Sequence, residues 1–256
     1  MSRSRRYLLI DISNSFTKIA RASAARIEQP RRIPTAKLNG AFLRRVIGRR
    51  KIDTFVVASV VPRKNREVRR AATRGAQIIW VGPDVRLGVG IDYPQPKSIG
   101  ADRLANAAAV AALYGAPAIV VDFGTAVTFD IVSAKRKYIG GVIAPGLEAM
   151  TTFLYQRTAL LPRISLREPR RAIGRSTIEA MRAGAVFGYR GLVSAIIAQI
   201  KSDAFPRQKV HVVATGGYAR LIGAKLKEID AIRPNLTLEG LRLIANLNAK
   251  AAEKVR

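Results

Sequence analysis

The sequence contains no cysteine, only one histidine and one tryptophan, and few acidic residues for a chain of 256 residues. The absence of cysteine excludes a disulfide framework and any thiolate metal site, and it fits a reducing compartment. The single histidine, His211, lies in an apolar run that predicts a strand, so it is expected to be a packed side chain rather than a catalyst. Chemistry based on thiols is therefore excluded.

No export signal or membrane-spanning segment is evident in the sequence. Residues 1–7 carry three arginines, but the apolar run that follows stops at Asp11 and is too short for a signal peptide. The longest uncharged stretch, residues 104–121, is interrupted by Asn106, Gly115 and Pro117. This stretch predicts a helix followed by a buried strand, and a cytoplasmic protein without membrane contacts is expected.

Acidic residues are scarce beside basic ones, because 17 Asp and Glu face 45 Lys and Arg, for a formal net charge of +28. The excess is densest in residues 1–70, which hold 19 basic and 4 acidic side chains. Such a field concentrates nucleotides, acidic metabolites or nucleic acid without identifying which. A generally basic surface is favoured over a dedicated nucleic-acid site, because the arginines between residues 38 and 50 fall opposite the apolar stripe of Leu38, Phe42 and Val46.

Two segments of the chain share one pattern. Residues 8–19 and residues 119–130 each read as a strand, an acidic turn and a returning strand. At a constant offset of 111, the matched pairs are Asp11 with Asp122, Ser13 with Gly124, and Thr17 with Thr128. The pattern indicates an internal duplication, with a boundary near residues 114–118.

Alternating helix and strand patterns follow each hairpin and predict α/β units packed on mixed sheets. In the first half, strands are expected at residues 54–60 and 77–81, with a basic helix at residues 63–74. In the second half, helices are expected at residues 177–200, 218–227 and 238–254, with a strand at residues 210–214.

The first acidic turn, residues 11–15, is a candidate phosphate site. Backbone N–H groups in a tight turn, with small hydroxyl and amide side chains, can cradle phosphate oxygens, and Lys18 on the returning strand adds a positive charge. Taken alone, the segment is better explained as an ordinary hairpin turn, since Asn and Ser are common turn formers.

The second turn repeats this chemistry at Asp122. A lone carboxylate at the end of a buried strand is costly unless it meets a cation, a donor or a ligand, and two at matched positions are harder to dismiss. The pattern resembles the acetate kinase, sugar kinase and actin superfamily, in which two acidic hairpins facing each other across a cleft form the phosphate and metal site. The resemblance implies an α/β fold of duplicated ribonuclease H-like (actin-like ATPase) domains, here residues 1–115 and 116–256, with mixed sheets flanked by helices.

Two further segments carry candidate chemistry. Gly216 and Gly217 end a predicted strand before a helix, where glycine lets the backbone approach a flat ligand, although this is also a common connection. Asp102 and Arg103 begin an alanine-rich helix. There a carboxylate is favoured by the helix dipole and can accept a hydroxyl proton, and the guanidinium can clamp a carboxylate. On composition alone, a helix-start Asp beside a surface Arg explains this pair better.

Combined, these segments make the chain resemble the type III pantothenate kinases over nearly its whole length. The segments that carry the resemblance are residues 98–106, 122–130, 138–146, 155–162, 173–181, 214–217 and 236–241. The resemblance implies ATP-dependent phosphorylation of pantothenate to 4'-phosphopantothenate, which is the first step of coenzyme A biosynthesis.

The resemblance also implies roles for individual residues. The residues that would bind ATP are Asp11, Ile12, Ser13, Asn14, Ser15, Phe16, Thr17, Lys18 and Thr125. Those that would bind pantothenate are Tyr93, Gly100, Ala101, Asp102, Arg103 and Thr177, with Asp102 as the proton acceptor. Asp122 would hold a monovalent cation, potassium or ammonium, and Mg²⁺ would accompany ATP. A homodimer is expected, with contacts from residues 155–162 and 177–200.

Two features depart from the family pattern, and alternatives stay open. Ser13 replaces the usual glycine of the first turn, which restricts the backbone and adds bulk near the phosphates, and the high charge is atypical. One alternative is a non-catalytic relative that acts as a nucleic-acid-binding or transcriptional accessory factor. It is disfavoured by the retained acidic and substrate residues and by the lack of an obvious nucleic-acid-binding motif. Another alternative is a superfamily kinase for a different hydroxy acid or amide.

Overall fold

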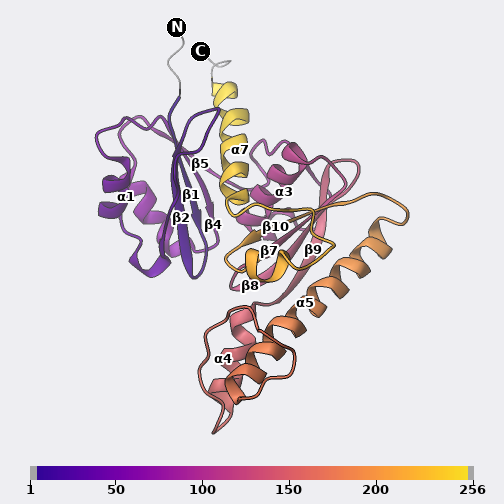
Figure 1. The fold of residues 1–256 in the computed structure, drawn as a ribbon. Helices are drawn as coiled ribbons and strands as arrows, with labels where there is room; N and C mark the ends of the chain where they lie inside the picture. The colour runs from indigo at the N-terminus through magenta and orange to yellow at the C-terminus, as the bar shows by residue number, and fades with distance from the viewer. Residues whose placement is uncertain (1–4, 253–256) are drawn as a thin grey trace. The chain divides into compact units, whose positions relative to one another are not determined.

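The computed structural model describes residues 5–252, which form two compact units (Figure 1). Unit 1 comprises the residues up to Tyr114, Arg136–Ile139 and the residues from Asn235 onward, and unit 2 comprises Gly115–Lys135 and Gly140–Pro234. Both units follow the expected plan of mixed sheets flanked by helices. The predicted domains 1–115 and 116–256 describe the two duplicated halves of the chain and remain a proposal. The compact units differ from them, because the C-terminal helix packs with unit 1.

Unit 1 contains a five-stranded sheet in the order β3-β2-β1-β4-β5. Its strands are β1 (Tyr7–Ile12), β2 (Phe16–Ala22), β3 (Arg31–Pro34), β4 (Thr54–Ser59) and β5 (Gln77–Trp80). The β1–β2 and β2–β3 pairs are antiparallel, and the β1–β4 and β4–β5 pairs are parallel. Every residue of β1 is buried, which is the pattern of a strand covered on both faces.

The helices of unit 1 are α1 (Gly40–Ile47), α2 (Asn65–Ala71), α3 (Ala101–Leu113) and α7 (Leu236–Ala252). Helix α1 is amphipathic as predicted, since Leu43 and Val46 are buried while Arg44 and Arg45 are exposed, although it begins after the buried Leu38. Unit 1 also contains three 3₁₀ turns, at Thr35–Lys37, Pro62–Lys64 and Pro96–Ser98.

Helix α7 packs closely on α3 through a glycine contact. A Cβ at Gly240 would lie 2.0 Å from the carbonyl oxygen of Ala105, so only glycine permits this approach. Beside it, the hydroxyl of Thr237 donates a buried hydrogen bond of 2.9 Å to Oδ1 of Asn106. Because α7 rests on α3, it also fixes the helix that carries Asp102.

Unit 2 contains a sheet in the order β11-β10-β7-β8-β9. Its strands are β7 (Ala118–Phe123), β8 (Ala126–Val132), β9 (Lys137–Pro145), β10 (His211–Gly216) and β11 (Ala231–Ile232). The β7–β8 pair is antiparallel and the β10–β7 and β10–β11 pairs are parallel. The first three residues of β9 are grouped with unit 1, where they pair with β6 (Gly90–Ile91).

The helices of unit 2 are α4 (Leu147–Arg157), α5 (Thr177–Ala204) and α6 (Ala219–Gly223). Helix α5 is 28 residues long, and its most apolar window has a mean hydropathy of 1.4, so by length and composition it could cross a membrane. A stripe of its side chains is nevertheless buried within unit 2. The stripe comprises Val186, Tyr189, Val193, Ile197 and Ile200. This spacing is that of an amphipathic core helix.

Candidate functional site

The predicted phosphate turn, residues 11–18 of unit 1, comprises the loop at residues 13–15 and the ends of the antiparallel strands β1 and β2 that it joins. Asp11 pairs with Lys18 and Ile12 with Thr17 in the β1–β2 ladder. Asp11 is buried, and its Oδ1 accepts a hydrogen bond of 3.0 Å from the Ser13 hydroxyl. The side chains of Asn14 and Ser15 at the tip are exposed. The turn therefore presents small polar groups above a buried carboxylate, with a lysine directly across the ladder.

Thr35 holds this turn from below. Its hydroxyl donates to the carbonyl of Ser13 at 2.7 Å and lies 2.9 Å from the hydroxyl of Thr17. A threonine hydroxyl has one hydrogen, so Thr17 must be the donor to Thr35. Thr17 and Ile12 are completely buried, which makes them supports of the turn. Sequence reasoning missed Thr35, because nothing near it in the sequence points to the turn.

Ser13 fits its position without backbone strain. Among residues 5–252, only Arg136 and Arg207 combine a side chain with a positive φ, so Ser13 adopts a conformation open to any residue. The matching residue of the second turn, Gly124, also has no positive φ. The departure from the family's glycine therefore adds a hydroxyl and a bond to Asp11 without distorting the loop.

The acidic turn of unit 2 is one residue shorter than the phosphate turn. In the β7–β8 ladder Asp122 pairs with Thr128 and Phe123 with Val127. Lys18, not Thr17, therefore occupies the position that Thr128 takes in the second hairpin. The constant offset of 111 is wrong beyond the turn, because equal residue spacing cannot reveal a deletion inside a loop.

Two glycines crowd the backbone of this second turn. A Cβ at Gly146 would lie 2.2 Å from the carbonyl oxygen of Thr125, and the N–H of Gly146 donates to that same oxygen at 3.1 Å. Gly216 has a φ of 93°, and a Cβ there would lie 2.5 Å from Oδ1 of Asp122. Only glycine fits at either position. The sequence indicated a close approach at Gly216 but gave no role to Gly146.

The segment that carries Gly146 is anchored by α5. The hydroxyl of Tyr189 donates to the carbonyl oxygen of Pro145 at 2.9 Å. Burial raises the pKa of Tyr189 to about 12, so the hydroxyl keeps its proton at neutral pH and remains a donor. On the other side of the turn, Tyr218 hydrogen-bonds to Glu148 of α4. Both tyrosines hold the Asp122 turn in place and were not singled out from the sequence.

The predicted substrate residues of unit 1 gather at the start of α3. Helix α3 begins at Ala101 and has Gly100 as its N-cap. Oδ1 of Asp102 accepts a hydrogen bond of 2.9 Å from the backbone N–H of Arg103, and a Cβ at Gly100 would lie 2.6 Å from the same oxygen. The carboxylate is thus fixed at the positive end of the helix dipole.

Tyr138 connects Arg103 with Tyr93. The guanidinium carbon of Arg103 lies 5.6 Å from the centroid of the Tyr138 ring, and the Tyr93 ring meets Tyr138 edge to face at 6.1 Å. Pairing of β6 with β9 sets Ile91 opposite Tyr138 and so delivers Tyr93 to this cluster. Tyr138 is completely buried, and sequence reasoning noted its segment without giving it a role.

Thr177 lies in unit 2, at the first position of α5. Ser176 is the N-cap, its hydroxyl accepting from the N–H of Glu179 at 3.2 Å, while Oε2 of Glu179 accepts from the N–H of Arg175 at 2.8 Å. The Ser176 cap, with Glu179 holding the residue before it, fixes the helix start, and Thr177 is exposed. Thr177 and the Asp102 cluster belong to different units.

The acidic side chains fit a metal that arrives with its substrate. Among the described residues, no group of three or more His, Cys, Asp or Glu side chains could hold a metal ion alone. Mg²⁺ in kinase sites typically uses one or two carboxylates plus substrate phosphates, and Asp11 of unit 1 is a buried carboxylate of this kind. Beside Asp122 in the β10–β7 ladder, the buried hydroxyl of Thr215 bonds to no described residue. Oxygen donors of this kind suit a hard cation.

Comparison with known proteins identifies the family. A sequence model of the type III pantothenate kinases matches residues 7–199. A type III pantothenate kinase of Akkermansia muciniphila is 49% identical over 243 residues, covering 94% of this chain and 99% of the relative. One from Methylacidiphilum infernorum is 45% identical over 96% of this chain and 90% of its own length.

Solved structures agree on the fold. The activator of 2-hydroxyisocaproyl-CoA dehydratase from Clostridium difficile, with bound ADPNP, superposes with a TM-score of 0.55 at 12% identity and covers 99% of this chain and 98% of its own. Its likeness is evidence of shared architecture, here the duplicated actin-like ATPase fold. With the family match and the close relatives, these findings show that the chain belongs to the type III pantothenate kinase family.

Proposed function

We propose that this protein transfers the γ-phosphoryl group of ATP to pantothenate and forms 4'-phosphopantothenate, the first step of coenzyme A biosynthesis. The family match and the close relatives support this activity. The structural observation that carries it is the cluster at the start of α3. There a fixed carboxylate, a guanidinium and two tyrosine rings occur together, which suits a polar substrate with a hydroxyl and a carboxylate.

Asp102 is proposed as the proton acceptor. It takes the proton of the pantothenate hydroxyl as the oxygen attacks the γ-phosphorus in line, and the bond to the ADP leaving group breaks. Arg103 would pair with the substrate carboxylate, and its contact with Tyr138 limits the positions that the guanidinium can adopt. Tyr93, Gly100, Ala101 and Thr177 are proposed to complete the pantothenate contacts.

The phosphate turn is proposed to bind ATP. Asn14, Ser15 and the backbone N–H groups of the loop would donate to phosphate oxygens, and Lys18 would balance their charge. The side chains of Ile12 and Thr17 are buried and would act by holding the loop, while Ser13 would orient Asp11. From unit 2, Thr125 is proposed to contribute a further phosphate contact.

Cations are proposed to complete the charge balance. Mg²⁺ would accompany ATP, and when bound it neutralises charge that develops on the phosphate oxygens. Asp122 is proposed to hold a potassium or ammonium ion. In the ladder it faces Thr128 rather than a lysine, and it lies against Gly216, where no side chain intervenes.

We also propose that the protein is a homodimer. Large apolar side chains of unit 2 are exposed on α4, on the first half of α5 and on the segment between them. They are Phe153, Tyr155, Leu160, Ile173, Ile178 and Phe187. Leu160 and Ile173 are 90% and 82% exposed, which is unusual for side chains of this size. Some of these side chains lie in residues 155–162 and others in residues 177–200, which are the two segments from which the family resemblance implies dimer contacts.

A soluble cytoplasmic enzyme is proposed, because α5 buries a stripe of side chains in unit 2 and its exposed apolar positions continue onto α4. The alternative of a non-catalytic accessory factor is not favoured. Its electrostatic basis, the charge of +28, does not account for the fixed Asp102 and the glycine-packed Asp122 turn.

The test is a coupled assay of ADP release with pantothenate, with and without potassium, on the wild type and on Asp102→Asn. Wild-type turnover should depend on pantothenate and on the monovalent cation, and the variant should lose about 10²–10⁴-fold in kcat while its ATP affinity changes little. Undiminished turnover in the variant would show that Asp102 is not the proton acceptor. Lack of turnover with pantothenate, together with turnover on another hydroxy acid, would favour a different substrate.

A further inference from the structure

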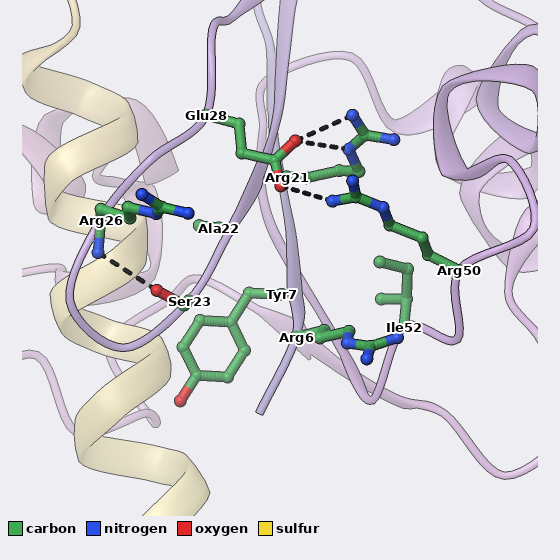
Figure 2. A pocket seen from close by; sticks show the side chains of 9 residues that line it. All are labelled: Arg6, Tyr7, Arg21, Ala22, Ser23, Arg26, Glu28, Arg50 and Ile52. Carbon is green, nitrogen blue, oxygen red and sulfur yellow. Dashed lines mark hydrogen bonds and ion pairs between the residues drawn. The ribbon is translucent and has the colours of Figure 1, made fainter. Parts of the chain in front are cut away.

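A pocket of about 420 Å³ opens in unit 1, away from the residues assigned above (Figure 2). Its charged lining consists of Arg6, Arg21, Arg26, Arg50 and Glu28. Tyr7, Ala22, Ser23 and Ile52 complete the wall, and three of these, Tyr7, Ala22 and Ile52, are buried. The volume lies in the range of small-molecule sites.

The pocket lies at the far end of the β1–β2 hairpin from the phosphate turn. Tyr7 pairs with Ala22 at the pocket end of the ladder, and Ile12 pairs with Thr17 at the turn. Five residues of extended strand separate the two ends, which is roughly 16 Å at ~3.3 Å per residue. A ligand in this pocket is therefore distinct from the ATP phosphates proposed for residues 11–18.

Glu28 organises two of the arginines. Its Oε2 lies 2.8 Å from Nη2 of Arg21, and its Oε1 lies 2.8 Å from Nη1 of Arg50. Burial opposes ionisation of Glu28, but hydrogen bonds and charge from Arg21 and Arg50 outweigh it and hold the pKa of the carboxyl below its ordinary value. The carboxylate thus stays charged and fixes both guanidinium groups at the pocket wall, as Figure 2 shows.

The other two arginines are not neutralised within the described part of the chain. The guanidinium groups of Arg6 and Arg26 make no ion pair with residues 5–252, and the hydrogen bonds of both residues are made by their backbone N–H and carbonyl groups. Four arginines against one glutamate leave the lining strongly positive. The positive charges around the pocket repel one another. An anion that enters the pocket relieves this repulsion and is attracted by all four arginines.

The origin of the arginines indicates the shape of the anion. The four arginines come from different segments: Arg6 precedes β1, Arg21 lies within β2 next to its last residue, Arg26 follows β2, and Arg50 precedes β4. A planar carboxylate is satisfied by one guanidinium fork, whereas the oxygens of phosphate groups can accept from several directions. The buried Tyr7, Ala22 and Ile52 offer apolar contact for the remainder of the ligand.

We propose that this pocket is a second anion site, which binds a small phosphorylated metabolite carrying at least two negative charges. The site is independent of the kinase reaction assigned to Asp102. Arg6 and Arg26 supply guanidinium donors that no residue of 5–252 engages in an ion pair, and Arg21 and Arg50 are positioned by Glu28.

The test is calorimetric titration of inorganic pyrophosphate into the wild type saturated with Mg²⁺ and a non-hydrolysable ATP analogue, so that the ATP site is filled. The double variant Arg6→Ala/Arg26→Ala should weaken pyrophosphate binding at least about tenfold, because each lost charge-assisted hydrogen bond has a large effect on affinity. The matched control is Arg63→Ala/Arg74→Ala, which removes the same charge from exposed positions of unit 1 outside the pocket. It should change the dissociation constant less than about twofold.

A third variant tests the direction of the effect. Glu28→Gln removes the one carboxylate of the lining and should tighten pyrophosphate binding about threefold or more. Pantothenate-dependent turnover of the variants serves as a check that they are folded. The proposal is overturned if saturated wild type shows no binding, if both double variants weaken binding equally, or if Glu28→Gln weakens it. Equal affinity for citrate would contradict the preference for phosphate.

Discussion

The two acidic hairpins share a plan but are held in different ways. The phosphate turn of unit 1 is fixed by side chains, with Thr35 and Thr17 beneath it and Ser13 bonded to Asp11. The Asp122 turn of unit 2 is one residue shorter and is fixed by backbone packing from Gly146 and Gly216. One hairpin is thus held by side-chain hydrogen bonds, whereas the other is held by two neighbouring segments that must have glycine where they pack against it.

The two hairpins also differ in the residue that lies opposite the aspartate. Lys18 lies opposite Asp11 in the ladder, whereas Thr128 lies opposite Asp122. A turn with a lysine across from its carboxylate suits an anionic phosphate, and a turn without one suits a cation.

The largest effect is expected from Gly216→Ala. The new methyl group would meet Oδ1 of Asp122 at 2.5 Å at a residue whose φ is 93°, so overpacking and backbone strain combine. We expect a loss of about 2–4 kcal/mol in the free energy of unfolding and at least about a hundredfold loss of turnover. Urea denaturation and the ADP-release assay measure both.

Gly82→Ala is the matched control for this substitution. A Cβ at Gly82 meets no atom within 4 Å, and its φ is not positive. Its stability should change by no more than about 0.5 kcal/mol. Equal effects of the two alanines would show that the Asp122 turn is not held by glycine packing.

Asp122→Asn should separate the cation from the nucleotide. Removing the charge should raise the potassium concentration needed for half-maximal activity by about tenfold or more, because a neutral amide attracts the cation less. Asp11→Asn should instead reduce kcat/KM for ATP and leave the potassium requirement within about threefold. Potassium titrations at saturating ATP distinguish the two. If both variants shift the potassium requirement equally, the division of roles between the hairpins is wrong.

Lys18→Met tests the ladder position that differs between the hairpins. Loss of the ammonium should raise KM for ATP by about tenfold, since a charge-assisted contact to a phosphate is removed. Thr128→Val, at the matching position of unit 2, should change KM for ATP by less than about twofold. Steady-state kinetics at varied ATP measure both constants, and a larger effect at Thr128 would contradict the register-based equivalence.

The smallest effect is expected from Ser13→Gly, which restores the residue usual in the family. Because the backbone of Ser13 is not strained, replacing it with glycine relieves no strain. The substitution removes the hydrogen bond from the Ser13 hydroxyl to Asp11. Stability should fall by about 0.5–1.5 kcal/mol, and kcat/KM for ATP should change less than about threefold. A marked gain in activity would show that the serine does obstruct the phosphates.

Local patterns were sufficient to predict most of the elements. The strands expected at residues 54–60 and 77–81 are β4 and β5, and the apolar run at residues 104–121 is α3 followed by β7. The helix expected at residues 218–227 is wrong in length, because α6 ends at Gly223 and the chain continues in turns. The last residues of the helix expected at 238–254 lie outside the described residues.

The supports of the site could not be predicted, because they come from distant parts of the sequence. Thr35 reaches the phosphate turn from 22 residues beyond Ser13, and Tyr189 reaches Pro145 across 44 residues. Tyr138 joins Arg103 and Tyr93 only because β6 pairs with β9. The site residues themselves came mainly from family resemblance, whereas the contacts that hold them follow from the fold.

The most direct test of the central claim is identification of the product. The protein would be incubated with ATP, Mg²⁺, potassium and pantothenate, and the mixture analysed by mass spectrometry and ³¹P NMR. The account predicts pantothenate carrying one phosphoryl group on its primary hydroxyl, formed together with ADP. This product should not form when potassium is omitted, and it should form about 10²–10⁴-fold more slowly when Asp102 is replaced by Asn. ATP hydrolysis without phosphorylated pantothenate would contradict it.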